Sequence, residues 1–117
     1  VETKEGADTV AIAGATAFAV SVMTDAGVDA VSLSEVSAGE DISVFAGPAA
    51  DSVDLLEVAA GKNLTVLTDV GDDTVVATAA SAVSDAVFDG GDGVDVLDDN
   101  GITGGEKKEI KGFETIL

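Results

Sequence analysis

The chain has 117 residues, no cysteine or histidine, and a formal net charge of −18, with 23 acidic residues against five lysines. The lack of cysteine excludes disulfides, and the charge argues against nucleic acid and anionic membrane surfaces as partners. Hydrophobic residues make up 46% of the chain, which is too much for a disordered acidic segment, yet no apolar run has the length of a membrane span. We therefore expect a single folded domain over residues 1–117. The acidic surface of a halophilic protein is an alternative explanation of the charge.

An aspartate recurs along the whole chain at an interval of 21 to 22 residues. A glycine stands two positions before most of the copies, and Val or Leu stands two positions after each. The repeated aspartates are Asp8, Asp29, Asp51, Asp73 and Asp95. Such a period is typical of a solenoid, in which each repeat forms one coil and buries its apolar face only against its neighbours. The period predicts coils near residues 6–26, 27–48, 49–70, 71–92 and 93–117.

Apolar residues alternate within each coil, which is the period of a half-buried strand and not of a helix. The alanine-rich residues 77–86 are ambiguous alone, but their apolar positions align with those of the other coils and favour strand. We predict an all-β fold, a right-handed parallel β-solenoid (a β-helix or β-roll), with one shared aliphatic core. Three apolar clusters per coil favour a three-sided helix, with a flattened roll of two sheets as the alternative.

The two ends of the repeat depart from the common pattern. The first coil is one residue shorter than the others, between Asp8 and Val20. In the last coil, residues 98–101 (Asp-Asp-Asn-Gly) are expected to interrupt the strand, and Lys108 occupies a position that is apolar in the other coils. We expect this lysine-bearing segment to form a partial cap over the last coil.

The repeated aspartate has the parity of the inward-facing residue that follows it, so its side chain is expected to point into the turn. Stacked coils would place these carboxylates about 5 Å apart, where like charges repel by roughly 1–3 kcal/mol per neighbour at an effective dielectric constant of 20–80. The lysines lie mostly near the chain ends and cannot neutralise this row. Several Ca²⁺ ions could, because calcium accepts carboxylate and carbonyl oxygens with tolerant geometry, whereas zinc and copper lack their usual ligands here. The alternative is that each aspartate caps the backbone of its own turn.

Residues 90–98 read Gly-Gly-Asp-Gly-Val-Asp-Val-Leu-Asp and resemble one copy of the RTX nonapeptide, Gly-Gly-x-Gly-x-Asp-x-apolar-x. In that family consecutive copies stack into a β-roll and bind calcium in the turns, so the resemblance implies the Asp95 carboxylate and the carbonyls of Gly91 and Gly93 as ligands. Weaker copies of the motif surround Asp73 and Asp29. RTX copies follow one another every nine residues, whereas here one turn per coil carries the motif. The candidate calcium ligands are Asp95, Gly91, Gly93, Asp92, Asp89, Asp73, Gly71, Asp69, Asp29 and Asp25.

The wider pattern is similar to solenoid segments of bacterial surface-layer proteins and large adhesins. This resemblance implies an extracellular, cell-surface structural module that binds calcium and builds a layer, an adhesin stalk or a filament. Because solenoid ends expose unpaired strand edges, we expect a homo-oligomer or a head-to-tail polymer through these ends. An ice- or glycan-binding surface is an alternative. A polysaccharide-acting β-helix enzyme is the least favoured interpretation, since the chain has no His, Arg or Tyr for proton transfer or oxyanion stabilisation.

Overall fold

The computed structural model describes every residue from Val1 to Leu117 and contains strands, turns and no helix. No helix that could cross a lipid bilayer is therefore present. The strands are β1 (Thr9–Ala13), β2 (Thr16–Ala17), β3 (Val20–Met23), β4 (Ala30–Ser34), β5 (Ser37–Ala38), β6 (Ile42–Phe45), β7 (Ser52–Ala60), β8 (Leu64–Leu67), β9 (Thr74–Ala82), β10 (Asp85–Asp89), β11 (Val96–Gly104), β12 (Lys107–Lys111) and β13 (Thr115–Ile116).

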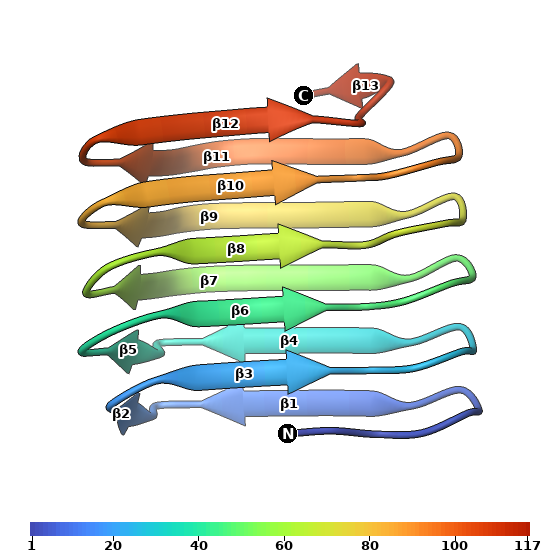
Figure 1. Cartoon of the computed structure of the whole chain (residues 1–117), viewed down its shortest axis with the longest axis horizontal. Helices are drawn as coiled ribbons and strands as arrows, with labels where there is room; N and C mark the ends of the chain where they lie inside the picture. Colours follow the sequence, from blue (N-terminus) through green and yellow to red (C-terminus); the bar gives the residue numbers. More distant parts are fainter.

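The strands stack into a parallel β-solenoid of two sheets. One sheet has the order β1-β4-β7-β9-β11-β13, with β2 and β5 attached to it, and the other has the order β12-β10-β8-β6-β3. Paired residues are 21 apart between the first two coils, as in Thr9 with Ala30, and 22 apart in most other pairs, as in Ser52 with Thr74. In Figure 1 the nearer strands run left to right, the more distant ones run back, and the chain rises with each coil, which makes the solenoid right-handed. The predicted fold and period are confirmed.

The core is a set of continuous apolar columns, each made of equivalent residues from successive coils. One column contains Val10, Val31, Val53, Val75 and Leu97, all of which are buried. Further columns run through Leu33, Leu55 and Ala77, through Val36, Val58 and Ala80, and through Val44, Val66 and Phe88, all at 0–1% exposure. Since each coil contributes only a thin layer, the apolar face of every inner coil is covered by the coils above and below it.

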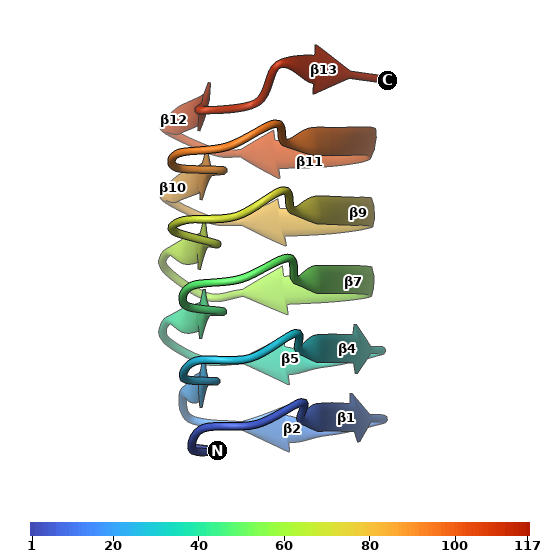
Figure 2. The ribbon, with the colours of Figure 1, turned by 90° about the vertical axis from the view of Figure 1, so that its right-hand side faces the viewer.

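The first two coils have three strands each, as the apolar clusters predict. In the later coils β7, β9 and β11 each run through the first two of these segments, and the strands form only two hydrogen-bonded sheets. The larger sheet bends sharply within β7, β9 and β11, and Figure 2 shows the two arms of this bend. One residue per coil lies in the left-handed region at the bend, including Glu57 (φ 54°) and Ala79 (φ 52°). This residue shifts the alternation by one position, so that side chains on both arms face the core.

The last coil is closed by an ion pair at positions that are apolar elsewhere. Asp99 is level with Ala77 in β9, and Lys108 is level with Ala86 in β10. The Lys108 Nζ donates to Asp99 Oδ2 at 2.7 Å, and Asp99 Oδ1 accepts the backbone N–H groups of Gly101 and Ile102. The predicted interruption of this strand is wrong, because these hydrogen bonds let β11 continue from Val96 to Gly104. The lysine-bearing segment, expected as a partial cap, forms β12, which pairs in register with β10 as a strand of the last coil.

The left-handed residue at the bend predicts how a substitution to glycine there changes the stability of the fold. Ala79→Gly should stabilise the fold by about 1 kcal/mol, because an alanine in the left-handed region is strained and glycine is not. Ala59→Gly, on the exposed face of β7 outside the bend, is the matched control and should cost about 0.5–1 kcal/mol. Urea denaturation of both variants measures the difference in the free energy of unfolding. A loss of stability in both variants would contradict the claim that Ala79 is strained.

Candidate functional site

The aspartate-bearing turns lie along one edge of the solenoid, at the right in Figure 1, where each strand of the smaller sheet passes into the next strand of the larger one. All ten sequence-predicted ligand residues lie on these turns or next to them. They fall into a buried row formed by Asp29, Asp73 and Asp95, the glycines that pack between coils, and an exposed outer group.

The buried row is a continuous hydrogen-bond ladder between coils. In each step the backbone N–H of one repeated aspartate donates to the carboxylate Oδ1 of the equivalent aspartate in the next coil. The N···Oδ1 distances are 2.7 Å for Asp8 to Asp29, 2.7 Å for Asp29 to Asp51, 2.7 Å for Asp51 to Asp73 and 2.8 Å for Asp73 to Asp95. These lengths are typical of charge-assisted bonds. The ladder therefore provides acceptors for turn N–H groups at the point where the regular strand pairing is interrupted.

The second carboxylate oxygen of every ladder aspartate is buried without a hydrogen-bond partner. This holds for the Oδ2 atoms of Asp8, Asp29, Asp51, Asp73 and Asp95. Exposure of the whole residue is 3% for Asp51 and 0% for Asp95. Burial raises the pKa of Asp51 to about 7, and the charges of Asp73 and Asp29 add to this, against the hydrogen bond from the Asp29 backbone. Burial likewise raises the pKa values of Asp73 and Asp95. These carboxylates therefore take up protons more readily than exposed aspartates do.

The turn glycines are required by the close approach of successive coils. A Cβ on Gly93 would lie 1.7 Å from the Gly71 carbonyl oxygen, and one on Gly71 would lie 1.9 Å from the carbonyl oxygen of Ala49. Both glycines have positive φ values, 146° and 147°. Gly91 packs in the same way, since its Cβ would lie 1.9 Å from the Asp69 carbonyl oxygen. Close packing between coils therefore explains why these positions are glycine without any bound ion.

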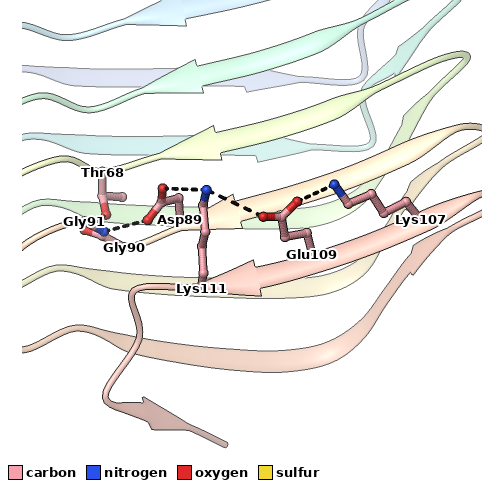
Figure 3. Close-up of polar contacts among 7 residues, drawn as sticks. All are labelled: Thr68, Asp89, Gly90, Gly91, Lys107, Glu109 and Lys111. Atoms are coloured by element: carbon pink, nitrogen blue, oxygen red, sulfur yellow. Dashed lines mark hydrogen bonds and ion pairs between the residues drawn. The ribbon is translucent and has the colours of Figure 1, made fainter.

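The outer acidic side chains are spread along the edge and do not converge. Asp25, Asp69 and Asp92 are exposed. Asp89, at the end of β10, already has protein partners: its Oδ1 accepts the Gly91 N–H at 3.0 Å, and its Oδ2 lies 3.6 Å from the Lys111 Nζ (Figure 3). A cation that used Asp89 would have to displace Lys111.

Beside these turns is a hollow of about 300 Å³, with Phe45 and Leu67 among its apolar lining and Asp69 and Asp89 among its polar lining. Its only titratable groups are carboxylates. Nowhere in the chain do three acidic side chains meet in an arrangement that could hold a metal ion. Calcium at this edge would therefore take at most two carboxylates and would depend on backbone carbonyls and water for its other ligands.

Three members of the ladder are absent from the sequence-predicted ligands: Asp8, at its first step, Asp51 and Glu114. Asp51 aligns with the repeat, and the structure gives it the same geometry as Asp73. Glu114 has no place in the predicted repeat: its Oε2 accepts the Asp95 N–H at 2.7 Å and so replaces a sixth aspartate. Glu114-Thr115-Ile116 matches Asp73-Thr74-Val75 in chemistry, but the last step is 19 residues long, which hides it from a search at a fixed period.

Compared with known protein families, curated proteins and solved structures, the chain matches none.

The close packing of the turn glycines predicts that substitution by alanine destabilises the protein by different amounts at different turns. Gly93→Ala should destabilise the protein by roughly 3 kcal/mol or more, because the new Cβ meets a backbone carbonyl and the backbone conformation is strained. Gly6→Ala, with a similar φ but open space around the Cβ, isolates the strain and should cost about 1–3 kcal/mol. Thermal unfolding of the two variants separates the contributions; equal losses would rule out close packing as the reason for Gly93.

The ladder also predicts an inverse pH dependence. A carboxyl with a pKa raised in the folded state binds more protons there than in the unfolded chain, so stability falls as pH rises from about 4 through about 7. The melting temperature, measured in chelator, should therefore increase as pH is lowered from 8 to 5. Asp51→Asn, which keeps an acceptor for the Asp29 N–H, should flatten this curve. A melting temperature that increases with pH over this range would contradict the assignment.

Proposed function

We propose that this protein is a structural module of an extracellular, cell-surface assembly, in which the solenoid serves as a short rod and its acidic edge binds calcium. The observation that carries the proposal is that the coils account for the chain from one end to the other, leaving no separate element for catalysis. Every strand belongs to one of the two stacked sheets. The chain also lacks His, Cys, Arg and Tyr, which supports a role other than an enzyme.

The unpartnered carboxylate oxygens support calcium as the ligand of the edge. Buried charged oxygens without a partner are costly, and a hard cation with flexible coordination relieves both the missing contacts and the repulsion along the row. Asp73 and Asp95 are the central candidates, since they are fully buried and the turn between them carries the best copy of the motif. Because few carboxylates converge, we expect weak binding, with a Kd on the order of 10⁻⁴–10⁻³ M as in extracellular calcium modules.

Calcium-dependent stability tests this function. With a Kd of about 1 mM, 10 mM CaCl₂ should stabilise the fold by about 1.4 kcal/mol per site, and MgCl₂ should do less. Asp73→Asn retains a hydrogen-bond acceptor and should reduce the calcium effect. Asp54→Asn, on the exposed face of β7, makes the same charge change away from the turns and should leave the effect intact.

Thermal unfolding at fixed ionic strength, with and without chelator, is the measurement. A melting temperature that does not respond to calcium, or equal effects of the two asparagine variants, would contradict a specific site on the turns.

A further inference from the structure

We propose that copies of this chain stack end to end in the register of the coils, with the C-terminal end of one copy against the N-terminal end of the next, and that the junction is a coil built from both. This inference names the partner of the structural module proposed above and rests on that proposal. The two termini lie at opposite ends of the solenoid (Figure 1).

The partial coils at the two ends have complementary shapes. At the N-terminal end, Glu2 pairs in parallel with Met23, so the first residues extend the smaller sheet below β3. At the C-terminal end, β13 pairs with β11 and extends the larger sheet. When a second copy follows in register, the two segments therefore lie in different sheets of one shared coil and do not compete for the same place.

Apolar residues that are exposed at the ends continue the core columns across this junction. Ile116 is level with Leu97 in the column that begins at Val10, and it is 54% exposed. In the stack, Val10 of the upper copy lies directly above it. Val1, one residue before Glu2, is at the register position of Val22 and is 60% exposed. In the stack it covers Ile110, which continues the same column at the other end.

One pair of opposite charges also lies in register at the two ends. Three of the five lysines lie in β12, the last strand of the smaller sheet, whereas Glu2 lies at the opposite end, where the Val1 ammonium group and Lys4 also lie. One outward column runs from Met23 through Phe45, Leu67 and Asp89 to Lys111, and Glu2 precedes Met23 in it. Stacking in register therefore places Glu2 of the upper copy next to Lys111, whose side chain is 56% exposed.

The half of the shared coil that neither copy supplies lies above the only charged pair in the core columns. In the shared coil, residues 113–117 of one copy and 1–3 of the next do not occupy the positions directly above Asp99 and Lys108. Their ion pair faces this opening, opposite Ile12 and Val20 of the upper copy, while Leu97 and Ile110 lie under the covered half. The strand edge at the N-terminal end is also open to pairing. The edge strand β1 (Thr-Val-Ala-Ile-Ala) carries no charged side chain that would prevent pairing with another strand.

Sedimentation velocity from about 10 µM to 1 mM, in chelator, tests the junction. We expect concentration-dependent association of the wild-type chain. Ile116→Asp should weaken it at least about tenfold, because a carboxylate would be buried between Leu97 and Val10 without a partner. Val83→Asp, at a 66% exposed valine on the side of the solenoid between β9 and β10, makes the same kind of substitution outside the junction and should leave association unchanged within about twofold.

A charge exchange then identifies which ends meet. Glu2→Lys and Lys111→Glu should each weaken association by roughly fivefold, since each places like charges at the junction. A mixture of the two single variants should associate more tightly than either alone, because the lysine introduced in one variant then meets the glutamate introduced in the other. A contact between two identical ends would involve only one of the two positions, so one of the two single substitutions would leave association unchanged.

A wild-type chain that stays monomeric at 1 mM overturns the inference, as does a Val83→Asp effect equal to that of Ile116→Asp, or a mixture no tighter than its components. The calcium melt of the Ile116→Asp variant distinguishes this failure from failure of the proposed function. A response to calcium in that variant supports the edge site whether or not the ends associate.

Discussion

The whole structure depends on the stacking of equivalent residues one coil apart. In a parallel β-solenoid each position contacts the same position in the coils above and below at about 4.8 Å, so a side chain must fit against near-copies of itself. Leu33 on Leu55 satisfies this by forming an apolar column. At the turns the same spacing brings the Gly71 carbonyl against Gly93, where a side chain would not fit. A substitution in one coil is therefore felt by both neighbours.

The aspartate ladder is the polar consequence of the same constraint. Where the chain turns, one backbone N–H per coil has no strand partner, and the carboxylate of the next coil accepts it. This arrangement places like charges in a buried row and leaves one oxygen of each carboxylate without a hydrogen-bond partner. Burial therefore raises the pKa values of Asp51, Asp73 and Asp95. The features that stabilise the turns thus also make their carboxylates easier to protonate. The ladder has a direction, since Glu114 completes it at one end and Asp8 has no coil below it at the other.

The sequence predicted the fold well because the relevant signals are local and repeated. Alternation around Val53 and Leu55 identified strands, and the recurrence of aspartate fixed the register that pairs Ser52 with Thr74. Prediction of the site was less complete. Burial of Asp73 and Asp95 was anticipated, but their hydrogen-bond partner is the backbone of the preceding coil, whereas the expectation favoured an ion. The strand through Asp99 was misjudged because Lys108, nine residues away, neutralises it.

By itself, the sequence determined the coil length, the inward face of each strand and the parallel stacking, since side-chain alternation and a fixed period leave few other ways to bury the same columns. Only the tertiary structure decided which polar atoms meet, because each ladder bond joins residues about one coil apart in sequence and depends on turn geometry rather than on residue type. It also decided that the strand segments form two sheets, through the left-handed residue at the bend, which can be Gly14, Glu57 or Ala79 and so leaves no consistent mark in the sequence. The replacement of a sixth aspartate by Glu114 has the same origin: a shorter last turn brings a longer side chain to the same N–H.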